Sequence, residues 1–190
     1  MDKNFFAVVI LLACAGAQAQ SSVYRVDPTH TRASWEAKHF GTSTSRGQWD
    51  KTDGEITLDK SAKTGKVDVT IDMSSINTGV APFNNHLKSP AFFDVANHAT
   101  ARFVGDKLKF DGDKLVEVGG DLTIRGKTNP ATLKAIAYNC YLHPSLKRDV
   151  CGGDFETTIK RSVFDVNWGL VEKFTDDDIK VSIQVEAIKQ

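Results

Sequence analysis

Residues 179–187 read Ile179-Lys180-Val181-Ser182-Ile183-Gln184-Val185-Glu186-Ala187, and their pattern indicates the fold class. Apolar and polar residues alternate without a break, so an extended chain presents one apolar face and one polar face. The same period of two recurs in residues 33–39 and 67–73. Half-buried strands of this kind are typical of antiparallel sheets, because parallel sheets are covered by helices on both faces. The pattern predicts an all-β protein.

Further strand-like segments precede this stretch and are separated by turn-forming residues. The segments span residues 23–27, 47–58, 100–110, 115–124, 132–140 and 155–160. Turn signals stand at residues 51–54, 111–113, 125–126, 129–130 and 152–153. About eight to ten short strands form either a sandwich or a closed barrel, and closure removes exposed strand edges. We therefore predict an antiparallel barrel of about eight strands.

Residues 81–89 break the strand pattern, because they are rich in Asn and poor in β-branched residues. Phe83 and Leu87 stand four positions apart and share one face of a short helix that ends before Pro90. We expect this helix near one end of the barrel. No repeat, low-complexity tract or linker divides the sequence, so residues 20–190 are expected to form a single domain.

The first 19 residues have the pattern of a secretory signal peptide. Lys3 supplies the positive charge, residues 5–13 are apolar, and Ala17-Gln18-Ala19 is a small-residue cleavage site. The pattern predicts an exported mature chain that begins at residue 20. A competing interpretation takes Leu11–Cys14 as a lipoprotein box in which Cys14 carries a lipid. An intact mass of the exported protein distinguishes the two.

Two cysteines remain after that cleavage, Cys140 and Cys151. An even pair in an exported protein is most simply a disulfide. The residues between them include His143-Pro144-Ser145, which suits a loop between two strands. A catalytic pair is disfavoured, because redox pairs usually stand as Cys-x-x-Cys at the start of a helix. We predict a structural disulfide.

The composition argues against several classes of function. The 24 Lys and Arg residues balance 24 Asp and Glu residues, without the basic stripe of a nucleic-acid-binding protein. The five histidines show no metal-ligand spacing, and no nucleophile elbow, zinc-protease motif or phosphate-binding loop occurs. We predict no enzyme activity, metal or cofactor, although a site of Asp and His assembled only by folding stays open.

Several short motifs occur in order along the chain. They include Tyr24-x-Val26-Asp27-x-x-His30-Thr31, His39-Phe40-Gly41, Asn85-His86-Leu87-Lys88-Ser89-Pro90-x-Phe92-Phe93-Asp94, Leu122-Thr123-Ile124-Arg125-Gly126-Lys127-Thr128 and Arg161-Ser162-x-Phe164. Together they resemble the YceI-like family of exported polyisoprenoid-binding proteins, over about residues 24–187. The family usually has Gly after the Phe of the last motif, whereas Asp165 stands there in this chain.

The resemblance implies a lipocalin-like barrel whose apolar tunnel holds a long isoprenoid chain, either a polyprenyl pyrophosphate or a quinone tail. It also implies a periplasmic location and, as in some members, a homodimer. The departure at Asp165 bears on the shape of one end of the tunnel.

The resemblance and the strand pattern together suggest a set of ligand-binding residues. These are Trp35, His39, Val69, Ile71, Asn85, His86, Phe92, Phe93, Arg161, Val181 and Ile183. The aliphatic members line a tunnel or fill a solid core, since the alternation is the same for both. His39 either bonds a head group or is structural, and Arg161 either binds a pyrophosphate or pairs with an acid such as Glu172. Residues 85–93 form either a lid over the tunnel or a plug in the barrel end.

We therefore expect a protein that binds a long-chain isoprenoid lipid or isoprenoid quinone for periplasmic transport, storage or sequestration. The alternative is a periplasmic stress or adaptor protein whose barrel presents a surface to a membrane-protein partner. In that case the lipid is an incidental filler.

Overall fold

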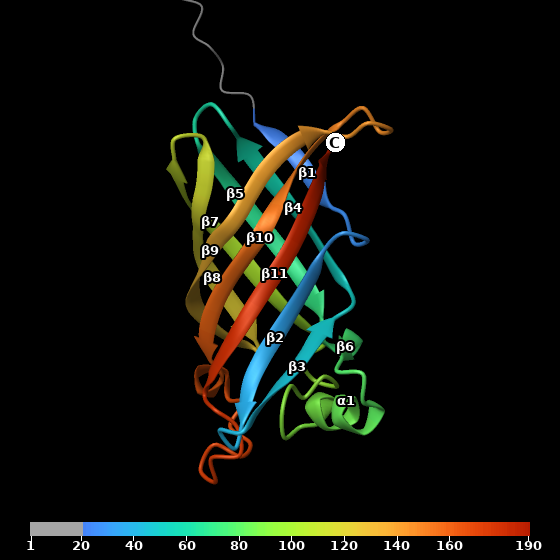
Figure 1. The fold of residues 1–190 in the computed structure, drawn as a ribbon, viewed down its shortest axis with the longest axis vertical. Coiled ribbons are helices and arrows are strands. Elements are labelled where there is room, and N and C mark those ends of the chain that lie inside the picture. The colour runs from blue at the N-terminus through green and yellow to red at the C-terminus, as the bar shows by residue number, and fades with distance from the viewer. Residues whose placement is uncertain (1–20) are drawn as a thin grey trace, which may run out of the picture.

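The computed structural model describes residues 21–190, which form an antiparallel barrel with one short α-helix (Figure 1). The strands are β1 (Ser22–Val26), β2 (Arg32–His39), β3 (Ser43–Trp49), β4 (Thr52–Asp59), β5 (Thr64–Asp72), β6 (Ile76–Asn77), β7 (Thr100–Asp111), β8 (Lys114–Ile124), β9 (Lys127–Leu142), β10 (Asp149–Lys160) and β11 (Asp178–Lys189). The helix α1 spans Ala81–Lys88, and 3-10 turns span Met73–Ser75 and Arg161–Phe164. The predicted signal peptide, with Cys14, lies outside the described residues.

Eight of the strands in residues 21–190 close into a barrel. Their order around the wall is β1-β4-β5-β7-β8-β9-β10-β11, and β11 pairs back with β1 through Ala187–Lys189. The strands β2 and β3 continue the wall beside β11, with the short β6 at their edge. Every neighbouring pair is antiparallel. The predicted all-β antiparallel barrel is confirmed.

The alternation at residues 179–187 places one face of β11 inside the barrel. Val181, Ile183 and Val185 line the interior, whereas Lys180 and Gln184 are exposed. Because side chains alternate between the two faces of a strand, the register of each strand pair places the apolar residues of neighbouring strands on the same, inner face of the wall.

Three predicted turns lie inside strands instead. Residues 52–54 belong to β4, residues 129–130 to β9 and residues 152–153 to β10. Gly152 and Gly153 serve the close approach of strands, because a Cβ added to either would collide with a carbonyl oxygen of β11 or β9. Pro130 lies in a part of β9 that pairs with β8 but, within residues 21–190, not with β10, so the missing N–H is tolerated.

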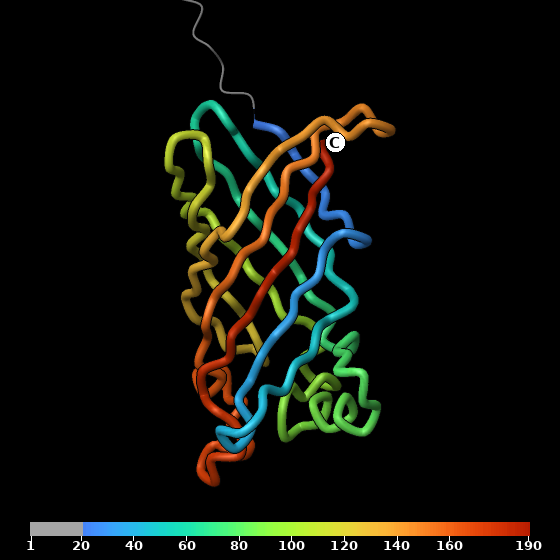
Figure 2. Tube along the Cα trace, in the orientation of Figure 1, coloured from blue at the N-terminus to red at the C-terminus, as the bar shows by residue number. Residues whose placement is uncertain are grey.

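The predicted disulfide joins Cys140 on β9 to Cys151 on β10. The two residues stand directly opposite each other in the strand register, with their Cα atoms 4.1 Å apart. The bond therefore staples the β9–β10 hairpin at the end of the barrel far from α1, which we call the disulfide end (Figure 2).

The helix α1 covers the opposite end, which we call the helix end (Figure 2). It has Pro82 in its first turn and ends at Lys88, before Pro90, as predicted. Leu87 is 4% exposed and belongs to the same apolar cluster as Trp35 and Phe92. Within residues 21–190 no helix has the length and apolar character needed to cross a membrane.

Candidate functional site

The interior of the barrel contains a cavity of about 160 Å³, which we call the barrel cavity. Its walls are aliphatic and aromatic side chains from strands all around the barrel. They include the predicted Val69, Ile71, Val181 and Ile183, together with Val67, Phe103, Leu122, Leu133, Phe155, Ile159 and Val185. The interior is therefore hollow in part, and the solid core that the alternation also allowed is not formed.

The burial of the inward side chains supports the same conclusion. Val69, Ile71, Val181 and Ile183 are only partly buried although they face the interior. Inward aliphatic residues of a close-packed core are normally buried almost completely. Here their remaining accessible surface faces the barrel cavity.

A second cavity of about 420 Å³ lies at the helix end, and we call it the helix-end cavity. It contains the predicted Trp35, His39, His86, Phe92, Phe93, Arg161 and Val181 in its walls. Trp49, Ile124, Ile159 and Val181 line both cavities, so the two adjoin. Ligand pockets commonly measure about 300–1,000 Å³, and the helix-end cavity lies within this range.

Arg161 has a structural role that neither sequence interpretation anticipated. Its guanidinium donates four hydrogen bonds to backbone carbonyls: Nη1 to Val166 and Trp168, Nη2 to Thr175 and Nε to Asp176, at 2.8–3.1 Å. Burial lowers the pKa of Arg161, and the charges of nearby carboxylates oppose this shift. The structure therefore gives the guanidinium four carbonyl partners and no ion pair with Glu172 within residues 21–190, and the contact with a pyrophosphate stays a prediction.

The aromatic residues of the helix end pack on one another. The ring of His86 lies 4.9 Å from that of Phe92 and 4.8 Å from that of Trp168, and Phe92 lies 5.2 Å from Trp168. The Phe93 ring contacts Trp49 at 5.8 Å. This packing has the geometry of a plug, although both interpretations of residues 85–93 place them here. Trp49 and Trp168 also belong to this region, although neither stands in a clear alternating run that would mark it in the sequence.

Two predicted residues lie at the margin of this region. His39 is exposed at the end of β2, where its ring packs 4.7 Å from that of Phe40 and borders the helix-end cavity. Asn85 is exposed on α1 and lines neither cavity. The helical period explains this, because it turns Phe83 and Leu87 inward and leaves Asn85 on the outer face.

Asp165, at the position where the resemblance leads us to expect Gly, adopts a backbone conformation that glycine favours. It has φ of 58°, in the left-handed region that Gly adopts easily and Asp tolerates. Arg125 Nη1 donates to the carbonyl of Asp165 at 2.8 Å and to that of Phe92 at 2.7 Å. These two bonds tie the loop that contains Asp165 to the segment that contains Phe92.

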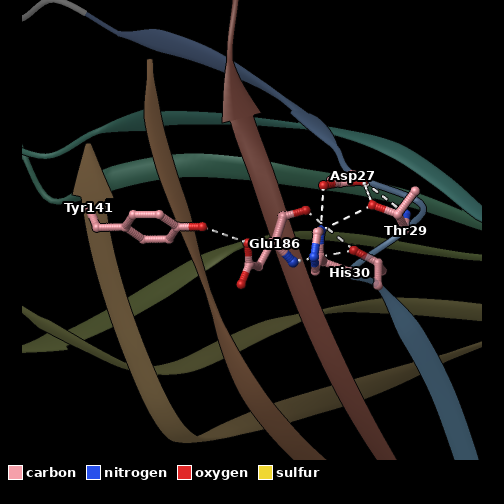
Figure 3. A network of polar contacts seen from close by, with 6 residues as sticks. Asp27, Thr29, His30, Tyr141 and Glu186 are labelled. Carbon is pink, nitrogen blue, oxygen red and sulfur yellow. Dashed lines mark hydrogen bonds and ion pairs between the residues drawn. The ribbon is translucent and has the colours of Figure 1, made fainter. Parts of the chain in front are cut away.

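A polar network lies outside the cavities, where the chain passes from β1 to β2 (Figure 3). The Asp27 carboxylate accepts bonds from Thr29 and contacts His30 Nδ1 at 2.8 Å. Burial raises the pKa of Asp27, but the bonds from His30 and Thr29 outweigh it and hold that pKa low. The same bond raises the pKa of His30. Tyr141 donates to Glu186 beside this group, at 3.0 Å.

This network fixes the connection between β1 and β2, which pair with different parts of β11. Thr31 Oγ1 donates to the backbone carbonyl of Glu186 on β11 and also accepts from its N–H. The groups therefore hold the turn against the barrel wall. Residues 21–190 contain no cluster of three or more His, Cys, Asp or Glu side chains that could hold a metal ion.

Comparison with known proteins gives consistent results. A model of the YceI-like domain matches residues 24–187. Protein YceI of Salmonella arizonae is 32% identical over 196 residues that cover 100% of both chains. The crystal structure of BcnA from Burkholderia cenocepacia superimposes with a TM-score of 0.70 at 23% identity, over 85% of this chain and 98% of that one. A polyisoprenoid-binding domain from Saccharophagus degradans, implicated in plant cell wall breakdown, gives a TM-score of 0.64 at 15% identity, over 88% and 98%.

Proposed function

Because the chain belongs to the YceI-like family, we propose that it binds the hydrocarbon tail of an isoprenoid lipid in the barrel cavity and the helix-end cavity. The polyisoprenoid-binding domain of the same fold supports this ligand class. The role is binding for transport, storage or sequestration, without catalysis.

One observation carries the proposal, namely an apolar interior that side chains leave partly unfilled. Val69, Ile71 and Ile183 keep accessible surface inside the barrel. Burial of apolar carbon contributes about 0.8 kcal/mol per methylene. About ten such groups give roughly 8 kcal/mol, which corresponds to a dissociation constant near 1 μM before the cost of ordering the chain.

The charges around the cavities favour a neutral head group. Arg161 is occupied by backbone carbonyls. Arg102 and Arg32 border the barrel cavity. Arg102 forms an ion pair with Asp68 at 2.6 Å, and Arg32 forms one with Asp50 at 3.4 Å. A pyrophosphate needs cations that are free to pair with it, so we propose an isoprenoid quinone in preference to a polyprenyl pyrophosphate.

Three buried polar atoms in the cavity walls are consistent with this choice. Trp35 Nε1, Trp49 Nε1 and Thr52 Oγ1 have no hydrogen-bond partner within residues 21–190. Each belongs to a residue that lines one of the cavities. Unpaired buried donors are costly, and a small rotation of one of these side chains that presents its donor to a carbonyl or hydroxyl of the ligand removes this cost.

Organic extraction of natively purified protein, followed by mass spectrometry, tests the proposal. We expect one dominant isoprenoid in near-stoichiometric amount. The variant Ile183→Trp fills the barrel cavity and should lower that amount at least tenfold, whereas Gln184→Trp, on the exposed face of the same strand, should retain it. A folded Ile183→Trp protein with the wild-type lipid content would refute binding in the barrel.

A second candidate function rests on exposed apolar side chains at the helix end. Val171 is 90% exposed, and Phe40 and Trp168 are 58% and 41% exposed. The ring of Phe174 joins the two aromatics, at 5.1 Å from Phe40 and 5.6 Å from Trp168. Exposed apolar patches mark interaction sites, so this surface suits the adaptor that contacts a membrane-protein partner.

Expression in a host that lacks long-chain isoprenoids distinguishes the two functions. An adaptor keeps its melting temperature, whereas a carrier purified from this host melts lower, because a ligand that binds only the native state stabilises it. The periplasmic location and the homodimer stay predictions, which cell fractionation and light scattering check.

A further inference from the structure

The barrel wall is not paired along its whole height between β9 and β10. The two strands pair from Leu142 and Asp149, near the disulfide, as far as Lys134 and Glu156. Beyond that pair, residues 127–133 pair with β8, and residues 157–160 pair with β11. Within residues 21–190 the facing edges of these two segments form no ladder with each other.

A gap of about 510 Å³ lies between the parted segments. The Lys134–Glu156 pair bounds it towards the disulfide end. A hydrogen bond from Asn129 Nδ2 to the carbonyl of Val163, 3.0 Å long, bounds it towards the helix end. The gap therefore has a closed rim and is a window in the wall.

The window lies directly against both cavities. Ala131, Thr157 and Ile159 line the window and the barrel cavity, so a single layer of side chains separates the two spaces. Ile159 and Phe164 also border the helix-end cavity. Movement of these few side chains connects the interior to solvent.

Each end of the barrel is covered by buried side chains. Tyr24 and Ala187, which are 2% and 0% exposed, lie in the cluster that fills the disulfide end beside Cys151. Leu87 of α1 is 4% exposed in the cluster at the helix end. Opening either end breaks packing, whereas opening the window breaks no strand ladder.

We propose that the window between β9 and β10 is the portal through which the isoprenoid tail enters and leaves the barrel. This inference rests on the proposed function. A portal is crossed in both directions, so a change that narrows it slows association and dissociation by the same factor and leaves the dissociation constant unchanged.

Trp substitutions at the rim test the portal. Thr132 and Thr158 are exposed, border the window and do not line the barrel cavity. The double variant Thr132→Trp/Thr158→Trp narrows the window from outside. Thr57→Trp/Lys66→Trp is the matched control, because these residues face each other across the fully paired β4 and β5.

The measurement is stopped-flow uptake of dansyl-labelled farnesyl amine by delipidated protein, and its release into detergent. We expect both rate constants of the window variant to fall at least tenfold, with the dissociation constant within twofold of wild type and the control unchanged. Asn129→Ala removes the bond to Val163 at the rim and should accelerate both rates. This second variant keeps the test decisive if the Trp pair prevents folding.

The outcomes separate the portal from the proposed function. If the variants take up and release the probe at the wild-type rates, the portal is refuted and lipid binding stands. If the wild-type protein takes up no probe, the lipid-binding proposal and the portal both fail.

Discussion

Replacement of Arg161 by Met tests the most heavily bonded side chain at the helix end. Arg161 is 5% exposed, and methionine fills much of the same space with an apolar side chain. The substitution removes four hydrogen bonds to backbone carbonyls of residues 166–176. A bond from a charged donor contributes about 1.5–3 kcal/mol. The four do not add fully, since water reaches some of the freed carbonyls. We expect a loss of about 3–5 kcal/mol, as for a buried ionic group that is broken.

Urea denaturation followed by circular dichroism measures this loss. With a slope near 2 kcal/mol per molar urea, the midpoint falls by about 2 M. Domains have a free energy of unfolding of about 5–15 kcal/mol, so the variant should still fold, with a small remaining free energy of unfolding. Its lipid content should also fall, because the freed loop covers the helix-end cavity.

Two control variants make the result specific. Arg46→Met removes an exposed pair with Glu36 and should cost less than about 1 kcal/mol. Glu172→Gln should cost nothing, because the Arg161 guanidinium contacts carbonyls instead of this carboxylate. A loss below 1 kcal/mol for Arg161→Met, or an equal loss for Glu172→Gln, would show that the carbonyl bonds do not stabilise the loop.

Two further predictions concern the disulfide and the polar network. The double variant Cys140→Ala/Cys151→Ala should lose about 3 kcal/mol, because the bond restrains a short loop in the unfolded chain, and a melting curve without reductant checks this. An unchanged melting temperature would exclude a stabilising role. The bond to Asp27 raises the pKa of His30 in the folded protein above its unfolded value of 6.5. The stability that this bond contributes is therefore complete below pH 6.5 and is lost as the pH rises through the folded-state pKa. His30→Gln should therefore melt below wild type at pH 5.5, and the two curves should converge in alkaline buffer; a constant difference across this range would contradict the assignment.

The sequence predicts the strands well where one face is apolar and the other polar. Residues 179–187 form the inward and outward faces of β11 as the alternation indicates. The helix before Pro90 and the Cys140–Cys151 bond are also found. The alternation and the helix depend on neighbouring side chains, whereas the disulfide follows from there being two cysteines in the predicted mature chain.

Other features depend on contacts that local patterns do not carry. Gly152 and Gly153 signal a turn in the sequence but serve strand approach in the fold. The partners of Arg161 are carbonyls, which every residue has, so no side chain marks them. A hollow interior has the same alternation as a filled one. Pro130 lies in the part of β9 that borders the window, but proline is also common in turns, so the sequence alone does not indicate the window.

The closing seam of the barrel has a consequence for how the molecule is made. Tyr24, Arg25 and Val26 pair with Lys189, Ile188 and Ala187, so the seam joins β1 to β11, the first and last strands within residues 21–190. A nascent polypeptide cannot complete the barrel until β11 has been synthesised. Such distant pairing slows folding, because a very long loop is ordered before the seam contributes any stability. Truncation before β11 should therefore leave an open sheet with unpaired edges that aggregates, instead of a smaller barrel.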